Sequence, residues 1–328
     1  MRSLLRHLAA AALLLWLVVT VVFVLARSAP GDPVLMIVSP SASASEIATA
    51  RARLGLDAPI AVQYARWTRG VLRGDFGTSI ASGRAVRSVL ADAVPVSLFL
   101  GGVSLLLSFA IGIGLGSIQA RRPGTRLDLA MTMATTAVAA APAFWLALGA
   151  IAVFTYGAAR LGFPAALRLP AFGLHSPAGG PSGTGWLFDL VRHSILPVGV
   201  LTAVGAAGIS RFARSALIDV VGLDAIRAAR GRGLTGARLN IHVMRIALPG
   251  LLVLLALTLP GTIAGSVFVE TVFAWPGMGR AMTSAILGRD IPVVLGATLV
   301  YGAAVIAANL IADLALPLVD PRLRRETS

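Results

Sequence analysis

Residues 93–120 read AVPVSLFLGGVSLLLSFAIGIGLGSIQA, a run that contains no aspartate, glutamate or arginine. About 20 apolar residues are enough for a helix to cross the hydrocarbon core of a bilayer. Five further runs without these charged residues occur, at 8–26, 129–159, 194–210, 246–269 and 291–312. The sequence therefore predicts an all-α polytopic membrane protein with about six transmembrane helices.

The composition of the whole chain agrees with this class. The 328 residues are 57% hydrophobic and 13% charged, against about 25% charged residues in soluble domains. All 28 basic residues are arginine, and the net charge is +14. These arginines flank apolar runs, which favours a topological role over nucleic-acid binding. Without cysteine, disulfides and thiolate metal sites are excluded, and the four scattered histidines predict no metal site.

Two of the runs allow more than one interpretation. The third run is long enough for a span plus a loop, and Pro142 either kinks it or splits it into two helices. The first run follows Arg2 and Arg6, as a signal peptide would. Its 19 uncharged residues exceed a signal core of about 7–15 residues, and no small-x-small cleavage site follows. An uncleaved first helix is the favoured interpretation.

The distribution of arginine predicts the orientation of the chain. With the N-terminus in the cytoplasm, 15 arginines lie inside and 13 outside, eight of them in one long outer segment. Both termini are then cytoplasmic. The predicted parts are a first transmembrane helix (1–27), a small helical extracytoplasmic segment (28–92), a core with five further spans and an inner loop at 211–248 (93–320), and a tail (321–328). Apolar positions at Ile60, Val62, Tyr64 and Trp67 indicate the helix in the outer segment.

The inner loop holds the most basic stretch, RAARGRGLTGARLNIHVMRIALPG at residues 227–250. Asp224 is predicted to cap a short helix over 225–230, which Gly231 and Gly233 end. Thr235 is predicted to cap a second helix that runs into the fifth span. On it, basic and apolar side chains occupy different faces, at Arg238, His242 and Arg245 and at Leu239, Val243 and Ile246. By spacing alone, the arginines either fix topology or make the short helix a docking site for a cytoplasmic partner.

The glycines Gly231, Gly233 and Gly236 also spell GxGxxG. A dinucleotide site needs a strand before this motif and an acidic residue about twenty residues after it. Here a helix is predicted before it, and residues 251–269 hold no acid. A chain without lysine cannot supply a P-loop lysine either. Nucleotide binding by this chain is therefore not expected.

Residues 227–249 resemble the EAA loop of the inner-membrane permeases of ABC importers. The matching positions are Ala228, Ala229, Gly233 and the pair Leu248–Pro249, whereas Arg227 stands where the family often has glutamate. Other motifs follow in the order of the dipeptide, oligopeptide and nickel branch. They are APGDP (29–33), LGLDAPIAVQY (54–64), Trp67, GDFGTS (74–79), PAFW (142–145), VETVFAWPGMGR (269–280) and DPR (320–322).

The resemblance implies a type I ABC importer permease fold in the bacterial plasma (inner) membrane. It implies a subunit without catalysis that forms half of a translocation pathway for peptides or a related small solute. The implied partners are a second, paralogous permease, two ATPase subunits that bind ATP and magnesium, and a lipid-anchored or periplasmic solute-binding protein, besides membrane lipids. No cofactor is expected in this chain.

The resemblance also assigns candidate residues. The loop 224–249 would couple to the ATPases through Asp224, Arg227, Ala228, Ala229, Arg230, Gly233, Leu234 and Pro249. Candidates for the pathway or an outer gate are Trp145, Glu270, Phe273 and Trp275. Phe273 and Trp275 alternatively suit an interfacial anchor or a short re-entrant turn.

The main alternative function is a stand-alone secondary transporter or channel. Such transporters place charged groups deep within their spans, and these spans are almost bare of them. A membrane-embedded enzyme would need a nucleophile–base pair or a metal cluster, and the spans show neither.

Overall fold

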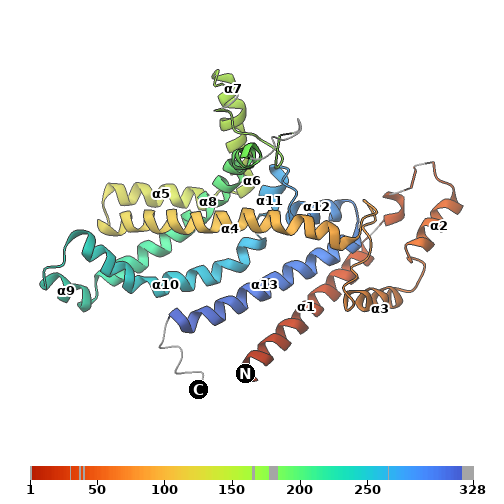
Figure 1. Ribbon diagram of the computed structural model, residues 1–328, viewed down its shortest axis with the longest axis horizontal. Coiled ribbons are helices and arrows are strands. Elements are labelled where there is room, and N and C mark those ends of the chain that lie inside the picture. Colours follow the sequence, from red (N-terminus) through yellow and green to blue (C-terminus); the bar gives the residue numbers. More distant parts are fainter. Residues whose placement is uncertain are drawn as a thin grey trace. The chain divides into compact units, whose positions relative to one another are not determined.

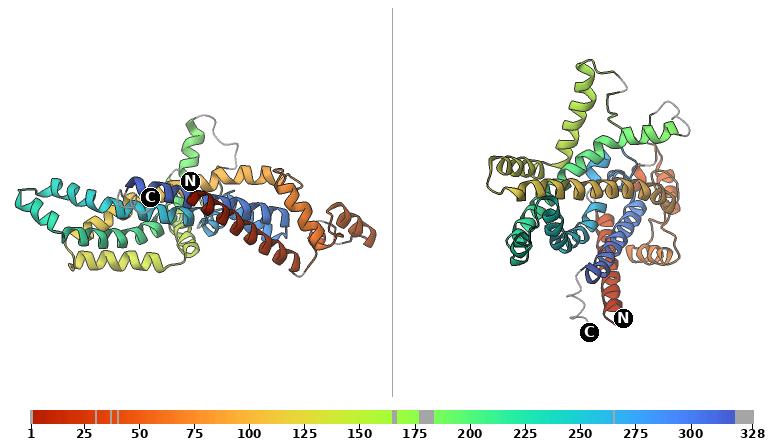
Figure 2. Two further views of the ribbon diagram at one scale, coloured as in Figure 1. Left: turned by 90° about the horizontal axis from the view of Figure 1, so that it is seen from below. Right: turned by 60° about the vertical axis from the view of Figure 1, so that its left-hand side comes forward.

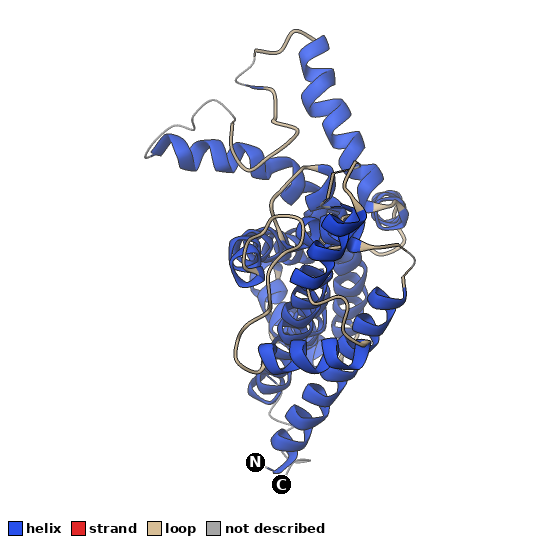
Figure 3. Cartoon of the chain, turned by 90° about the vertical axis from the view of Figure 1, so that its right-hand side faces the viewer, coloured by secondary structure: helices blue, strands red, loops and turns tan. Residues whose placement is uncertain are grey.

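The computed structural model describes residues 2–29, 31–36, 38–39, 41–164, 167–176, 184–264 and 266–319. In these residues every regular element is helical, and one isolated bridge joins Thr78 to Ala85 (Figure 3). Within the described ranges, six helical stretches are long and apolar enough to cross a membrane: Leu8–Ser28, Val86–Arg121, Ala143–Arg160, Thr184–Val221, Gly236–Leu259 and Ile291–Asp313. The predicted class of all-α polytopic membrane protein is confirmed.

The helices follow one another as labelled in Figure 1. They are α1 (Arg2–Ser28), η1 (Pro33–Met36), α2 (Ala44–Arg53), α3 (Ile60–Val71), α4 (Val86–Arg121), α5 (Arg126–Ala140), α6 (Ala143–Ile151), the π-helix η2 (Ala152–Gly157), α7 (Ala158–Arg160), α8 (Thr184–Val221), α9 (Asp224–Gly231), α10 (Gly236–Ala264), α11 (Val267–Val272), α12 (Met278–Leu287) and α13 (Ile291–Val319). The chain divides into two compact units. The first comprises residues 1–97 and 276–306, and the second comprises 98–275 and 307–328.

In the first unit, α1 packs on the start of α13 and on α3. Val19 and Phe23 are buried against Leu295, and the Phe23 and Tyr64 rings meet edge to face at 5.1 Å. The Tyr64 hydroxyl also lies 2.6 Å from Thr20 Oγ1. The predicted helix of the outer segment is therefore present as α3. Tyr64 and Trp67 pack on α1, whereas Ile60 and Val62 are exposed.

The other core of the first unit joins the first turns of α4 to α12 and α13. Val86 and Leu90 are buried among Met278, Val293 and Ala297. A buried carboxylate fixes the segment before α4, because Asp290 accepts hydrogen bonds from Ser79 Oγ and from the backbone N–H groups of Ile80 and Ala81. Helix α4 begins at Val86, seven residues before the charge-free run that predicted it.

In the second unit, glycines bring α4 close to α8. A Cβ added at Gly112 would lie 3.0 Å from the Ala206 carbonyl oxygen, and one at Gly116 would lie 2.7 Å from that of Ser210. The two glycines are four residues apart and share one face, as in small-residue helix contacts. Gly114 meets nothing within 4 Å, so the predicted close packing holds for two of the three glycines in IGIGLG.

The third charge-free run is split at Pro142. Helix α5 ends at Ala140, Ala141 and Pro142 are extended, and α6 begins at Ala143. Proline lacks an N–H group and disfavours helical backbone at the residue before it, which accounts for the break. Of the two possibilities left open by the sequence, splitting is the correct one. The polar threonine at position 125 caps α5 by accepting from Asp128 N–H.

Candidate functional site

Helix α9 joins the ends of the long helices α8 and α10 (Figures 1 and 2). The chain leaves α8 at Val221 and turns through Gly222, and Leu223 takes an extended conformation (φ −68°, ψ 146°) as the N-cap residue of α9. The predicted short helix in the basic stretch is therefore present.

Asp224 is not the cap that the sequence predicted. It is the first residue of α9, and the N-cap residue Leu223 has no side-chain cap bond. The Asp224 carboxylate instead pairs with Arg227 Nη2 at 2.5 Å, three residues along the helix. A carboxylate in the first helical turn still suits the partial positive charge of a helix N-terminus. Because both side chains are exposed, the pair adds little to stability.

One face of α9 is anchored in the second unit. Ile226 and Ala229, three residues apart, are at most 1% exposed. Ile226 belongs to a buried cluster with residues of α8 and α10, among them Leu217 and Val243. Burial of an isoleucine side chain of this kind stabilises by about 1.5–3 kcal/mol. The helix is therefore attached firmly to the two long helices that it connects.

The opposite face of α9 is exposed and basic. Arg227, Ala228 and Arg230 are all exposed, and Leu223 is 45% exposed at the start of the helix. Arg230 also lines a crevice of about 240 Å³ together with Arg121 of α4. Of the predicted coupling residues, Arg227, Ala228 and Arg230 are accessible, whereas Ala229 serves the buried face.

The turn after α9 depends on glycine. Gly233 has φ +88°, in the left-handed region that residues with a Cβ rarely adopt. Its N–H donates to Arg230 O, and Leu234 N–H donates to Ala229 O. A Cβ at Gly233 would meet nothing within 4 Å, so its surroundings in this chain are open. Leu234 is half-buried beneath the turn.

Helix α10 runs without interruption from Gly236 to Ala264, so Pro249 lies inside the helix and is half-buried. The predicted separation of basic and apolar side chains onto different faces of this helix is confirmed. Arg238 and Arg245 are exposed and His242 is half-buried, whereas Val243 is buried and Leu239 and Ile246 are partly buried against the core below α9.

An ion pair between a buried aspartate and a half-buried arginine, which the sequence did not reveal, ties α5 to α8. Arg214 Nε and Nη2 each lie 2.7 Å from one oxygen of Asp128, and Gly124 N–H donates to the same carboxylate at 2.8 Å. The hydrogen bonds from Arg214 and Gly124 lower the pKa of Asp128 to about 2, so the pair is ionic at neutral pH. The Thr125-x-x-Asp128 spacing signals the helix start. Nothing local signals Arg214 as the partner.

The segment of the gate candidates is a tight buried turn. Glu270, Phe273 and Trp275 are at most 1% exposed. Ser266 Oγ donates to Glu270 Oε1 at 2.6 Å, and Trp275 N–H donates to Glu270 O at 2.8 Å. The Trp275 ring lies parallel to that of Phe99 at 6.3 Å. Such burial is wrong for an interfacial anchor and agrees with the short turn that was the other interpretation.

Trp145 differs from these three residues because its side chain is exposed. It is on the first turn of α6, after the Pro142 break, and is 61% exposed. The four gate and pathway candidates are therefore one accessible aromatic residue and three residues of a packed turn. Their roles in transport stay predictions.

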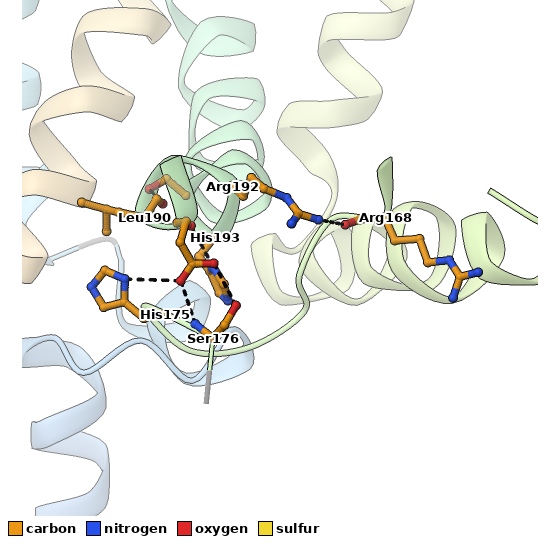
Figure 4. Close-up of polar contacts among 8 residues, drawn as sticks. Arg168, His175, Ser176, Leu190, Arg192 and His193 are labelled. Atoms are coloured by element: carbon orange, nitrogen blue, oxygen red, sulfur yellow. Dashed lines mark hydrogen bonds and ion pairs between the residues drawn. The ribbon is translucent and has the colours of Figure 1, made fainter. Parts of the chain in front are cut away.

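A polar cluster forms where the loop before α8 meets that helix (Figure 4). The buried Asp189 carboxylate accepts from Ser176 N–H and Oγ at 2.8 Å each, and His175 Nδ1 lies 3.6 Å away. His193 Nδ1 lies 2.8 Å from the Asp189 carbonyl oxygen. Arg192 Nη2 donates to Arg168 O at 2.7 Å. Two histidines that look scattered in the sequence thus share one aspartate, and no metal-binding group of three ligands occurs among the described residues.

An apolar groove of about 770 Å³ runs between α4, α5 and α8. Leu107, Val138 and Val198 are among its lining side chains, and its few hydroxyl groups come from Thr135, Ser194 and Thr202. Such a surface suits acyl chains or an apolar helix, because it offers few partners to the charged ends of a peptide.

Six apolar helices, two of which (α8 and α10) are joined by the exposed basic helix α9, define a polytopic membrane protein. A model of the family described as binding-protein-dependent transport system inner membrane component matches residues 112–325. A second model, of the N-terminal part of such membrane components, matches residues 1–101. The chain belongs to this family and is a permease subunit of an ABC importer.

Similar proteins from bacteria are also permeases of transport systems. The oligopeptide transport system permease protein AppB of Bacillus subtilis (strain 168) is 34% identical over 306 residues, which are 92% of this chain and 92% of that protein. The probable D,D-dipeptide transport system permease protein DdpB of Escherichia coli (strain K12) is 36% identical over 322 residues, 94% of this chain and 93% of that protein. The family decides against a stand-alone transporter or channel.

The fold has a counterpart among solved structures. A chain of the methionine ABC transporter MetNI, in an inward-facing conformation, matches with a TM-score of 0.55 and 20% sequence identity. The match covers 71% of this chain and 97% of that one. It confirms the predicted permease fold.

Proposed function

We propose that this permease imports peptides and is driven by separate ATPase subunits that contact α9. The names of its relatives, which are permeases of oligopeptide and dipeptide transport systems, support peptides as the solute class. The observation that carries the coupling role is the two-sided α9, with Ile226 buried and Arg227 and Arg230 exposed.

The anchoring of α9 gives a physical route for coupling. A partner that holds the exposed face and moves would also move α8 and α10, because Ile226 is buried in one cluster with residues of both helices. ATP shifts the transporter between outward-open and inward-open states only if its affinity for the ATPases differs between them. Because α9 moves with the ATPases, the state of the ATPases that ATP favours also favours one of the two states of the permease.

ATP and magnesium are bound by partner subunits in this proposal. The chain has no lysine, so a P-loop lysine must come from another polypeptide. Its GxGxxG glycines lie at the end of α9, in the turn and at the start of α10, where a helix rather than a strand comes first. The coupling helix then faces the cytoplasm of a bacterial inner membrane, with both termini on that side, as the arginine distribution predicts.

A second, paralogous permease completes the pathway, and an external lipid-anchored or periplasmic binding protein delivers the solute. The groove between α4, α5 and α8 supports the need for a second permease, since its apolar lining does not suit a peptide. Polar surface for the solute is expected where the two permeases face one another.

Purification of the tagged protein from its native membrane in mild detergent, followed by mass spectrometry, tests the assembly. We expect a second permease, a P-loop ATPase and a solute-binding protein in stoichiometric amounts. A stable preparation of this chain without any ATPase would contradict the proposal.

The coupling role of α9 is tested separately with Gly233→Trp in the assembled transporter. We expect ATP hydrolysis to become independent of solute uptake while the complex stays intact. Gly124→Trp is the matched control, because Gly124 also has a positive φ (+78°) and nothing within 4 Å of a built Cβ, but lies in the α4–α5 turn. Equal loss of coupling in both variants, or normal transport by Gly233→Trp, would place the ATPase contact elsewhere.

A further inference from the structure

The first unit contains two arginines whose guanidinium groups have no hydrogen-bond or ion-pair partner among the described residues. Arg27 lies in the last turn of α1, and Arg289 follows α12. Both are half-buried, and both line one cavity of about 180 Å³, together with Gly31, Ile286 and other residues. Arginine stays charged at any ordinary pH and carries five N–H donors. A partly buried pair of this kind calls for an anionic ligand.

The backbone at Arg289 is unusual. Arg289 has φ +52°, the left-handed conformation in which a helix commonly ends with glycine. A residue with a large side chain is strained there, and such an outlier is a reason to look for function. Glycine would satisfy the turn at lower cost, so the conformation alone does not explain an arginine at this position.

Gly31 leaves room for the Arg289 side chain. A Cβ built at Gly31 would lie 2.3 Å from Arg289 Nη1, and Gly31 itself has φ +107°. The guanidinium group therefore rests against bare backbone at the edge of the cavity. Any other residue at position 31 would displace it.

Arg27 does not pair with the neighbouring acids Asp32 and Asp290. Its Nε is buried and has no hydrogen-bond partner, and its guanidinium carbon lies 5.8 Å from the centre of the Phe23 ring. The nearest acids in the sequence are engaged elsewhere. Asp32 pairs with Arg51, and Asp290 accepts from Ser79, Ile80 and Ala81.

The size and the surroundings of the cavity select the ligand. Sites for whole drug-sized molecules have about 300–1,000 Å³, so a cavity of 180 Å³ holds a single polar group. Ile286, which lines the cavity, is 55% exposed, and Ala26, Ala29 and Ala285 add further apolar lining. An acyl chain can lie on the exposed side of Ile286 while its headgroup enters the cavity.

We infer that the cavity binds the phosphate of a membrane phospholipid between Arg27 and Arg289. The guanidinium fork matches phosphate oxygens in paired hydrogen bonds. Phosphate is also the group that anionic and zwitterionic phospholipids present at either surface of a bilayer. The bound lipid fastens the end of α1 to the turn after α12, two segments far apart in the sequence.

The test uses the full chain, purified and delipidated in a neutral detergent. Three probes separate the sources of the ligand: phosphatidylglycerol, a diacylglycerol with the same chains and no phosphate, and inorganic phosphate. We expect phosphatidylglycerol to bind at least about tenfold more tightly than either of the others, since a charged hydrogen bond and the acyl chains act together. Equal binding of inorganic phosphate would make this a free-anion site, and equal binding of the diacylglycerol would mean adhesion of chains alone; either overturns the inference.

Variants locate the binding. Arg27→Gln combined with Arg289→Gln should weaken phosphatidylglycerol binding by about tenfold or more. The matched control, Arg69→Gln with Arg87→Gln, changes the net charge equally at two exposed positions of the same unit and should bind normally. Wild-type binding by the first pair would refute the site.

A second variant keeps the test decisive if the double variant does not fold. Gly31→Ala retains both arginines and pushes the Arg289 guanidinium away from the cavity. It should also lose phosphatidylglycerol binding, with the thermal unfolding midpoint in detergent used to confirm that the chain is folded. Unchanged binding by folded Gly31→Ala would remove Arg289 from the site.

Discussion

Helices α9 and α11 are two short helices in the second unit that end in the same way and serve different purposes. The turn after α9 contains Gly233 with φ +88°, and the turn after α11 contains Ala274 with φ +52°. Helix α9 presents exposed arginines around one buried face. The α11 turn buries Glu270, Phe273 and Trp275 almost completely.

The difference explains why one turn needs glycine and the other tolerates alanine. Around Ala274 the backbone is held by hydrogen bonds from Trp275 N–H to Glu270 O and from Gly173 N–H to Phe273 O. The packing of the surrounding aromatic rings over-determines the strained conformation. Around Gly233 nothing lies within 4 Å of a built Cβ, so no packing offsets the strain of another residue. An exposed, glycine-dependent turn is available to a partner, whereas a buried turn belongs to the core.

The largest effect on stability is expected from Trp275→Ala. Removal of a fully buried tryptophan that lies parallel to Phe99 should lower the free energy of unfolding by about 3–5 kcal/mol. Unfolding of the purified chain by denaturing detergent measures the loss. Trp145→Ala is the control, because Trp145 is 61% exposed and its removal should change stability by less than about 1 kcal/mol. Similar losses in both variants would show that burial does not separate these two tryptophans.

Ile226→Ala should have the next largest effect. Truncation of this buried side chain should cost about 2–5 kcal/mol and loosen α9 from α8 and α10. Hydrogen exchange of the α9 amides, together with global unfolding, measures both consequences. The same substitution at Ile241, which is 55% exposed on α10, should leave exchange in α9 unchanged. Full protection of α9 in Ile226→Ala would mean that other contacts anchor the helix.

Gly233→Ala should lower the free energy of unfolding by a smaller amount, whereas Gly231→Ala should leave it unchanged or raise it slightly. The left-handed conformation at Gly233 should cost alanine about 1 kcal/mol or slightly more. Gly231 is the last helical residue of α9, where alanine should be neutral or stabilising by up to about 1 kcal/mol. Thermal unfolding of the two variants side by side gives both signs. The same sign for both would argue against a special conformation at Gly233.

The smallest effect on stability is expected from Arg227→Ala. The exposed Asp224–Arg227 pair should contribute less than about 1 kcal/mol, as measured by a double-mutant cycle with Asp224→Ala. In the assembled transporter, the same variant should weaken ATPase binding, because the side chain lies on the exposed face of α9. A large coupling energy between the two residues in the isolated chain would assign Arg227 a structural role instead.

Local pattern was sufficient to predict much of the architecture. The charge-free runs found the long helices, Pro142 marked the break between α5 and α6, and the glycines after residue 230 marked the end of α9. The capping assignment failed at Asp224 by one position, because Leu223 reaches the extended conformation of an N-cap without a capping side chain. The periodic residues of α9 did not by themselves tell which face was buried.

Long-range partners were not predictable from the same patterns. Asp128 and Arg214 are 86 residues apart in the sequence. Asp189 lies close to His175 from a loop and to His193 on its own helix, and Arg27 and Arg289 line one cavity although most of the chain separates them. Each of these residues looks like an ordinary charge or a lone histidine in the sequence. Their meaning depends on helix packing that brings them together.

The sequence by itself determined that this chain is a helical membrane protein, that Pro142 separates two helices and that glycines end α9, because hydrophobic length, proline and glycine act within a few residues. Only the tertiary structure decided that Ile226 anchors α9 and that Trp275 is buried in the core. It also decided that Arg27 and Arg289 line one cavity beside Gly31. The physical reason is that burial and charge pairing depend on neighbours distant along the chain, and one sequence carries no local record of which neighbours those are.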